Sequence, residues 1–340
     1  MSKAILDIGK EQVPYFRNAS FSQLLKESKK LLLKLVNAPK GSNVIFLTSS
    51  GTGAMEAAVI NLLDNKDKAI IINGGGFGQR FVEICSNHNI PLQNIIVNRN
   101  EKIDFDSINT NKANAFIVNA HETSTGRLYD LNKIGQFCQK NKLLNIVDAI
   151  SAFVCDEVNM KKQHIDALIL SSNKGLALPP GLAMVVLTPK AINRIKDIPS
   201  MYFNFKSYLS NIKRGQTPFT PAVSIIKQLH YRLKELDNLT IKESVKSTEV
   251  LARYFRKNIK HLPLKPYLQQ MSNAMTSLTP TDNKKADEII EDFEKRYNII
   301  LTPIGGDLKH KLIRVAHMGD MDIKYMNFLI KKLNHYYKCR

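Results

Sequence analysis

The 340-residue sequence predicts an α/β fold in which a mostly parallel central sheet carries helices on both faces and a smaller α+β domain follows. Short aliphatic runs, which indicate buried strands, alternate with helical stretches over the first half of the chain, as is typical of such a sheet. From about residue 260 the pattern changes to a few short strands and helices. We therefore expect an N-terminal segment at 1–20, a large α/β domain at 21–235 and a small C-terminal domain at 236–340.

The elements of the large domain can be placed in order along the chain. Residues 1–20 are expected to be irregular, and leucines at helical spacing predict an amphipathic helix over 21–37. Further helices are expected at 54–63 and 130–141. The predicted strands are short, aliphatic and bounded by turn residues, and they lie at 44–47, 69–72, 95–97, 115–119, 144–147, 165–170 and 182–187.

The remaining chain carries fewer strands. An irregular stretch is expected at 195–222, and one long helix is expected over 222–259. The small domain would be completed by short strands at 276–278 and 312–315 and by helices at 283–297 and 322–337.

The composition is that of an ordinary globular protein, with 44% hydrophobic and 23% charged residues. No apolar run approaches the ~20 residues that a membrane-spanning helix needs, and the N-terminus lacks the apolar core of a signal peptide. We therefore expect a cytoplasmic protein without a membrane partner. The four cysteines show no CxxC spacing, so neither a metal site nor a disulfide framework is indicated.

The formal net charge of +19 raises the question of a nucleic-acid partner. The lysines are spread along the chain, and no stretch combines basic and aromatic residues as RNA-binding motifs do. We therefore expect a solvated basic surface, which favours anionic substrates, and no nucleic-acid partner.

Residues suited to chemistry gather directly after the predicted strands. In parallel sheets, ligands bind at the carboxyl ends of the strands. The pair Gly51 and Thr52, the aromatic Phe77, the run 121–125, Asp148 and Lys174 each follow such a strand. This coincidence predicts one binding site along that edge of the sheet.

Lys174 lies in the stretch Ser171–Gly181, between the predicted strands at 165–170 and 182–187. A lysine held between buried strands has a depressed pKa, and lysines of this kind form Schiff bases with carbonyl compounds. On this stretch alone, a loop lysine that points into water is an equal alternative.

The segment Thr48–Gly53 joins a predicted strand to a stretch of good helix formers. Amides and hydroxyls at such a turn can face an anion at the positive end of the helix dipole, as in a phosphate site. Glu56 stands where a dinucleotide fingerprint needs its third glycine, and no Walker A lysine is present. The turn is therefore either a phosphate site of another kind or a helix cap.

Taken together, these motifs resemble the class-V aminotransferase branch of the fold-type I pyridoxal-phosphate enzymes. The resemblance extends from about residue 40 to about residue 320. It is greatest to alanine–glyoxylate, serine–pyruvate and 2-aminoethylphosphonate–pyruvate aminotransferases.

The resemblance implies roles in catalysis and substrate binding for three residues. Lys174 would form a Schiff base with the cofactor aldehyde and, once released, would move the proton between the substrate α-carbon and the cofactor. Asp148 would pair with the pyridine nitrogen and keep the ring protonated, so that the ring can accept electrons. Arg314, in a predicted strand of the small domain, would bind the substrate carboxylate.

The same resemblance implies where pyridoxal 5′-phosphate binds. Ser50, Gly51 and Thr52 match the phosphate-binding turn of the family. Phe77 stands where the family places an aromatic side chain that stacks on the cofactor ring, and the glycines around it would let the backbone approach the ring. Thr123 would hydrogen-bond the phenolic oxygen of the ring.

Three further residues complete the site that the resemblance implies. Ser172 or Asn173 would hold the phosphate or frame Lys174. Thr220 would reach the phosphate of the cofactor in the neighbouring subunit. The enzyme would therefore be a homodimer with shared active sites.

The resemblance implies an aminotransferase that moves an amino group between a small amino acid and a 2-oxo acid, pyruvate or glyoxylate, by a ping-pong Schiff-base mechanism. The alternative within the family is a 2-aminoethylphosphonate–pyruvate aminotransferase. A cysteine desulfurase is disfavoured, since residue 173 is asparagine and no cysteine lies between 156 and 338. The alternative of a different class is a basic binding protein that kept the fold and lost the chemistry.

Overall fold

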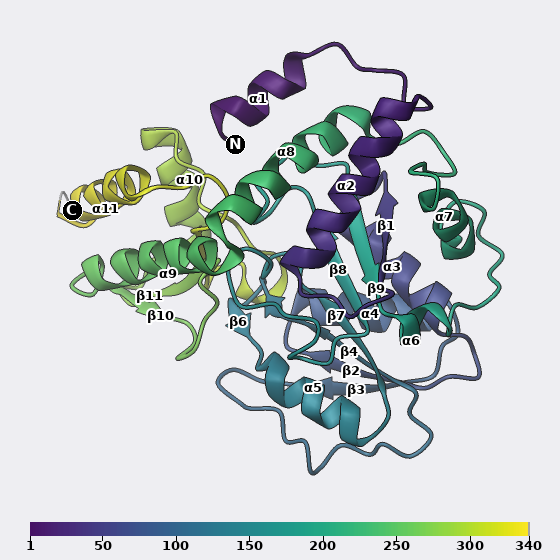
Figure 1. The fold of residues 1–340 in the computed structure, drawn as a ribbon. Coiled ribbons are helices and arrows are strands. Elements are labelled where there is room, and N and C mark those ends of the chain that lie inside the picture. Colours follow the sequence, from purple (N-terminus) through teal and green to yellow (C-terminus); the bar gives the residue numbers. More distant parts are fainter. Residues whose placement is uncertain (339–340) are drawn as a thin grey trace.

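The computed structural model describes residues 1–338 and contains a seven-stranded central sheet in the order β1–β9–β8–β7–β4–β2–β3 (Figure 1). Its strands are β1 (Asn43–Leu47), β2 (Ala69–Asn73), β3 (Leu92–Ile96), β4 (Ala115–Asn119), β7 (Leu144–Asp148), β8 (Ala167–Ser171) and β9 (Ala183–Leu187). β9 runs antiparallel to both of its neighbours, and every other neighbouring pair is parallel. The mostly parallel sheet predicted from the sequence is confirmed.

Each face of the sheet is buried under its own layer of helices (Figure 1). Along β1, Val44 and Phe46 belong to one apolar cluster and Ile45 and Leu47 to another, because successive strand side chains point to opposite faces. The first cluster includes residues of α2 (Ala19–Leu35), α5 (Leu131–Lys140) and α8 (Val223–Leu239), and the second includes residues of α3 (Gly51–Leu62), α4 (Gly76–Asn87) and α7 (Phe205–Ile212). The prediction of helices on both faces is also confirmed.

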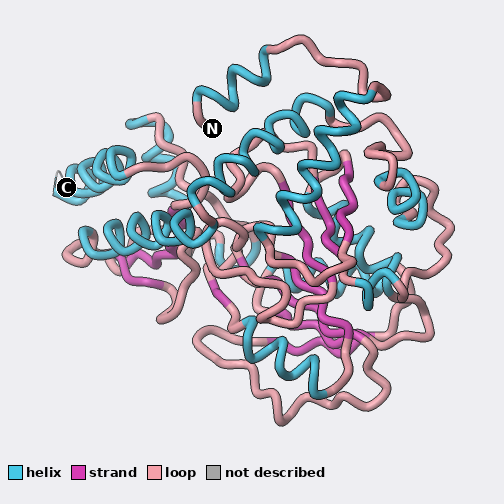
Figure 2. The backbone as a smooth tube through the Cα atoms, viewed as in Figure 1, coloured by secondary structure: helices cyan, strands magenta, loops and turns pink. Residues whose placement is uncertain are grey.

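The C-terminal part forms a smaller unit beside the sheet (Figure 2). It contains the antiparallel sheet β10 (Leu264–Pro266), β11 (Met275–Pro280) and β12 (Ile313–Ala316) and the helices α9 (Ile241–Asn258), α10 (Ala286–Tyr297) and α11 (Ile323–Lys338). These elements share a third apolar cluster. The predicted boundary at 235/236 falls inside α8 and stays a prediction. Within residues 1–338, no helix is both long and apolar enough to cross a membrane.

Two stretches that were expected to be irregular contain helices. The first is α1 (Lys3–Lys10), which Ser2 caps and which the Gln228 side chain binds by donating to the Ile5 carbonyl at 2.8 Å. The second is α7, where the Asn204 side chain accepts hydrogen bonds from the first helical amides. Both helices are only eight residues long, and docking on the large domain, rather than local propensity, stabilises helices of that length.

The prediction of a single helix over 222–259 is wrong, because the chain turns at Thr240 and forms the separate helices α8 and α9. Thr240 has a φ of +65°, which lies outside the helical region. Its hydroxyl accepts from the Glu243 amide at 3.3 Å and donates to the Glu243 carboxylate at 2.9 Å. The Thr-x-x-Glu spacing of a capping box was therefore the sequence signal for this break.

Gly135, in the middle of α5, lies where that helix contacts another backbone segment. A Cβ atom there would lie 2.0 Å from the Gln163 carbonyl oxygen. Alanine usually stabilises a helix by about 1 kcal/mol relative to glycine, but Gly135→Ala is expected to destabilise the fold by about 1–3 kcal/mol because the backbone must move. The matched control is Gly305→Ala, whose Cβ would have nothing within 4 Å and should change stability by less than about 0.5 kcal/mol. Urea unfolding measures both, and equal free energies of unfolding would contradict the close contact.

Candidate active site

The predicted site residues lie at one end of the central sheet. β1, β2, β4, β7 and β8 run in the same direction, so the segments that follow them meet beyond their carboxyl ends. A Cβ atom at Gly51, which follows β1, would lie 2.5 Å from the Cδ1 atom of Ile150 and 3.5 Å from the Cβ atom of Ser171. The turns after β1 and β7 and the end of β8 are therefore in direct contact.

Lys174 lies in a tight turn after β8, and its side chain is half-buried. The amide of Ala177 donates to the Lys174 carbonyl at 2.9 Å, which closes the turn. Burial lowers the pKa of the Lys174 ammonium group, the positive charge of Arg314 lowers it further, and the Asp148 carboxylate opposes both effects. A lowered pKa enriches the neutral amine, which is the nucleophilic form.

Asp148, the last residue of β7, is buried. Its Oδ1 accepts from the Ile150 amide and its Oδ2 accepts from the Asn119 side-chain amide, both at 2.8 Å. Burial raises the pKa of the Asp148 carboxyl to about 6 in spite of these two hydrogen bonds. No cation within residues 1–338 forms an ion pair with it, so the carboxylate can pair with a basic nitrogen of a ligand.

The helix start after β1 is open towards a ligand. Ser50 caps α3, since its Oγ accepts from the Gly53 amide at 3.3 Å. The amides of Gly51 and Thr52 have no partner inside the helix, because the first turn of any α-helix lacks acceptors. Together with the helix dipole, these groups suit a phosphate.

Arg80 joins this turn to the aromatic residue after β2. Its Nη1 donates to the Thr52 Oγ1 at 2.9 Å, and its guanidinium carbon lies 4.7 Å from the centroid of the Phe77 ring. A cation over an aromatic face stabilises the position of both groups. Sequence reasoning did not single out Arg80, although it follows Phe77 by three residues and therefore lies on the same helix face.

Arg314 of β12 connects the small C-terminal unit to this end of the sheet. Its Nη1 donates to the Thr123 carbonyl at 2.7 Å, and its Nη2 donates to the Pro303 carbonyl. Its Nε is buried and has no hydrogen-bond partner within the described chain. Thr123 itself is buried and follows the two-residue strand β5 (His121–Glu122). The arginine predicted to bind the substrate and the threonine predicted to bind the cofactor are thus in direct contact.

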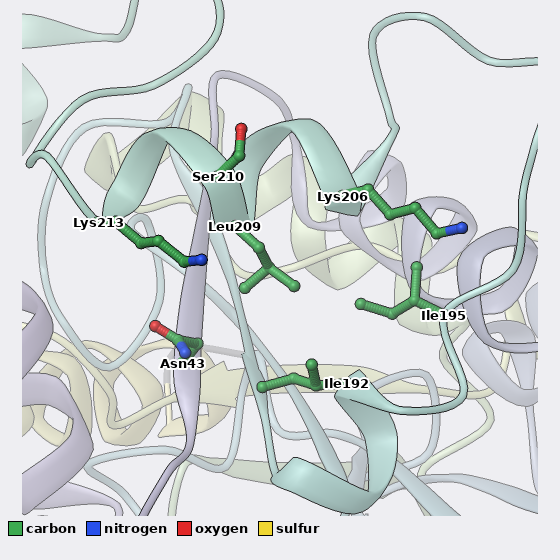
Figure 3. A pocket seen from close by; sticks show the side chains of 7 residues that line it. All are labelled: Asn43, Ile192, Ile195, Lys206, Leu209, Ser210 and Lys213. Carbon is green, nitrogen blue, oxygen red and sulfur yellow. The ribbon is translucent and has the colours of Figure 1, made fainter.

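A surface cavity of about 370 Å³ lies away from these residues (Figure 3). Ile192 of α6 (Pro189–Ile192) and Leu209 of α7 line it, with Asn43 at the amino end of β1. The predicted site lies beyond the opposite, carboxyl end of β1. None of the predicted site residues lines this cavity, so it does not belong to the site.

Comparison with known proteins identifies the family. The sequence model of the class-V aminotransferases matches residues 14–302, which is most of the chain. The chain belongs to the class-V aminotransferase family. The resemblance inferred from the motifs is thereby confirmed.

Curated relatives of this class-V aminotransferase cover nearly its whole length. It is 30% identical to an uncharacterized aminotransferase of Helicobacter pylori, over 91% of this chain and 84% of the relative. It is also 30% identical to the soluble hydrogenase 42 kDa subunit of Anabaena cylindrica, over 94% of this chain and 86% of that protein. An L-aspartate–glyoxylate aminotransferase of Paracoccus denitrificans is 24% identical over 90% of this chain and 80% of its own length.

Solved structures share the fold of this class-V aminotransferase. An aspartate aminotransferase of subgroup IV from Thermus thermophilus superposes with a TM-score of 0.92 at 23% identity, covering 99% of this chain and 97% of that one. The ureidoglycine–glyoxylate aminotransferase of Bacillus subtilis also reaches 0.92, at 19% identity, covering 98% and 89%. At these identities the likeness shows the fold.

The family depends on pyridoxal phosphate, and the residues present in this class-V aminotransferase fit that cofactor. Lys174 is an amine with a lowered pKa, suited to bind an aldehyde. Asp148 is a buried carboxylate without an ion-pair partner in the described chain, suited to a pyridine nitrogen. The first amides of α3 offer an anion site, and Phe77 is a half-buried ring that reaches this turn through Arg80.

Two residues next to the lysine hold its turn together. The buried Ser172 hydroxyl donates to the Pro179 carbonyl at 2.6 Å, and Asn173 Oδ1 accepts from the Ser171 hydroxyl at 2.7 Å. These contacts favour a role in positioning Lys174 over a role in binding the phosphate. Thr220, in contrast, is exposed on the single chain.

His121 belongs to the run 121–125 at the predicted strand ends, where sequence reasoning assigned it no role, and the structure buries it beside the site. Both of its ring nitrogens lack a hydrogen-bond partner within residues 1–338. Burial lowers the pKa of His121 to about 3, and the charges of Arg314 and Lys174 also lower it. His121 is therefore a neutral ring at physiological pH. Only the tertiary structure reveals this, since a histidine in a strand carries no signal of its burial.

Proposed function

We propose that this class-V aminotransferase uses pyridoxal 5′-phosphate to move an amino group between a small amino acid and a 2-oxo acid, glyoxylate or pyruvate. The observation that carries this proposal is the half-buried Lys174 amine, whose pKa is lowered and which interacts electrostatically with both Arg314 and Asp148. When bound, the cofactor supplies an aldehyde, which accepts and releases the amino group, and a ring, which accepts electron density from the substrate α-carbon.

Lys174 would carry out two tasks. Its Nζ would hold the cofactor between turnovers. As a free amine, the same Nζ would accept the proton of the substrate α-carbon and donate it again. Both tasks need a neutral amine, which burial and the Arg314 charge favour.

Asp148 would hold the cofactor ring in place, and Arg314 would hold the substrate in place. The Asp148 carboxylate would accept a hydrogen bond from the protonated pyridine nitrogen, and the Ile150 and Asn119 groups that bind it would keep it in place. Arg314 has a buried Nε without a protein acceptor, so its guanidinium could bind the substrate carboxylate while it holds the Thr123 carbonyl.

Two comparisons support glyoxylate as acceptor. The Paracoccus denitrificans relative is an L-aspartate–glyoxylate aminotransferase, and an Arabidopsis thaliana relative, 25% identical over 90% of this chain, is a serine–glyoxylate aminotransferase. The basic net charge of +19 also favours anionic 2-oxo acids over neutral carbonyl compounds.

The cysteines argue against sulfur transfer. Cys85, Cys138 and Cys155 are all buried, and burial raises the pKa of each thiol. A desulfurase needs a thiolate nucleophile, and a raised pKa disfavours that form. Cys339 lies outside the described residues.

We also propose that the enzyme acts as a homodimer with shared sites. The exposed Thr220 precedes α8, in a segment where Tyr202 and Phe219 stack at 5.1 Å. An exposed threonine beside an aromatic pair suits contact with a second subunit, where its hydroxyl would reach the phosphate.

Spectroscopy of the purified protein tests the proposed function. With pyridoxal 5′-phosphate the protein is expected to turn yellow, and borohydride should bleach it and leave the cofactor covalently attached to the peptide that contains Lys174. Alanine, serine, aspartate and 2-aminoethylphosphonate are supplied as amino donors to a separate sample that has not been reduced, and the loss of its colour identifies the substrate. A protein that stays colourless and unlabelled would contradict the proposal and would favour a basic binding protein on the same fold.

A further inference from the structure

Helix α4, which carries Phe77, begins without a local cap. The residue before it is Gly75, which has no side chain to accept a hydrogen bond. The first amides of a helix need acceptors from elsewhere, and a buried helix start without them is strongly disfavoured. The acceptors in this chain come from the hairpin of β5 and β6 (Arg127–Leu128).

Glu122 and Ser124 bind all three amides of the first turn. The Glu122 Oε2 accepts from the Phe77 amide at 3.0 Å and from the Gly78 amide at 2.9 Å. The Ser124 hydroxyl accepts from the Gly76 amide at 2.9 Å and donates to the Glu122 Oε1 at 2.6 Å. The Ser124 amide also donates to that oxygen, at 3.1 Å. A carboxylate 45 residues away in the sequence thus closes the helix.

The glycines before Phe77 make room for this carboxylate. A Cβ atom at Gly75 would lie 2.1 Å from the Ser124 Oγ and 2.9 Å from the Glu122 Cδ. Any larger residue would therefore push the carboxylate away from the helix. The Gly74–Gly76 run, at which we expected a backbone that approaches the cofactor, is shaped by Glu122 as well.

Glu122 is fully buried and forms no ion pair within the part of the chain described. Its charge is balanced by the amide groups and dipole of α4, an arrangement that stabilises a carboxylate. The anion site of α4 is thus filled by the protein itself. The start of α3, in contrast to that of α4, remains open for a phosphate.

We propose that Glu122 is a positioning residue of the transamination site: it holds Phe77 and Thr123 in the places from which they contact the cofactor. Two amides bonded to one carboxylate fix the first turn of α4, and Arg80 packs over the ring of Phe77. Thr123 lies between Glu122 and Ser124, and its carbonyl binds Arg314. This inference rests on the proposed function, because it presupposes a cofactor at the site.

Glu122→Gln tests the inference, since it keeps the size and removes the charge and one acceptor. In the cofactor-free protein, the amides of residues 76–78 are expected to exchange hydrogen at least about tenfold faster, because hydrogen bonds to a charged group are worth ~1.5–3 kcal/mol. If cofactor binding loses the same hydrogen-bond energy, the dissociation constant for pyridoxal 5′-phosphate should rise about tenfold to hundredfold. The visible circular dichroism of the bound cofactor should change, because it reports the geometry of the ring environment.

The matched control is Glu243→Gln, which removes a capping carboxylate from the exposed start of α9. It should leave amide exchange at 76–78, the cofactor dissociation constant and the dichroism unchanged. Ser124→Ala is the second test variant, in case Glu122→Gln does not fold. It keeps the carboxylate and should raise exchange at Gly76 and the dissociation constant in the same direction, by a smaller factor.

The outcomes separate the two proposals. If Glu122→Gln lowers the melting temperature but leaves the cofactor dissociation constant and dichroism within twofold of the parent, Glu122 is only structural and the inference is wrong. If the unmodified protein itself binds no cofactor, the proposed function fails together with the inference.

Discussion

Lys174→Ala is expected to lower kcat for transamination by about 10⁴-fold or more. One positioned proton-transfer group contributes up to about 10⁴-fold, and this variant also loses the amine that holds the cofactor. The fold should persist, because burial lowers the pKa of Lys174 and the chain loses a partly buried cation rather than a favourable contact. The measurement is steady-state transamination with the best donor, combined with the melting temperature of the cofactor-free protein.

Lys213→Ala is the control for the Lys174 variant. Lys213 is exposed and lines the cavity of Figure 3, away from the site. It should leave kcat within twofold of the parent. Retention of more than about one-hundredth of the parent kcat by Lys174→Ala would show that this lysine is not the group that transfers the proton.

Asp148→Asn is expected to inactivate the enzyme while making the cofactor-free protein more stable at neutral pH. Activity should fall by about 10²–10³-fold, the usual cost of removing one preorganised electrostatic partner, since a neutral amide cannot keep the pyridine nitrogen protonated. The new side-chain NH₂ group would find an acceptor, because the Asn119 amide can rotate and present its Oδ1, which has no partner within residues 1–338.

The gain in stability follows from the pKa of Asp148, which burial raises from the ordinary 3.8 to about 6. Between these two values the folded protein holds a proton that the unfolded chain has lost, so stability falls as the pH rises through this window. Above about pH 6 the folded protein bears the full free-energy cost of the buried Asp148 charge, which is about 3 kcal/mol for a pKa raised by about two units. Asp148→Asn removes this cost.

Thermal unfolding of the cofactor-free proteins between pH 4 and 8 measures the effect. The difference between Asp148→Asn and the parent should be small near pH 4 and largest above pH 6. The control is Asp64→Asn, for which the opposite sign is expected, because hydrogen bonds from Lys196 and Lys66 lower the pKa of Asp64. An equal change in stability at every pH would contradict the buried charge of Asp148.

The pattern of short aliphatic runs was sufficient to predict the central sheet. Strands buried on both faces must be continuously apolar, and the runs at 115–119 and 144–147 carry that signal without help from other parts of the chain. The short helix α1 escaped prediction because its stability depends on docking against α8 and not on its own eight residues. The capping box at Thr240 indicated the break between α8 and α9, but the helical periodicity on both sides of Thr240 favoured one continuous helix.

The sequence by itself determined which residues follow the strand ends, and hence that Lys174, Asp148 and the turn at Ser50–Gly53 share one edge of the sheet. In a mostly parallel sheet the carboxyl ends of the strands lie at one edge, so this placement needed neither the strand order nor the coordinates. Only the tertiary structure decided the pKa values of the site and the contacts that hold its residues in place. These are the lowered pKa of Lys174, the raised pKa of Asp148, and the hydrogen bonds of the Glu122 carboxylate to the start of α4. Burial and contacts between distant segments set these properties, because desolvation and hydrogen bonding depend on every neighbour in space and not on neighbours in the chain.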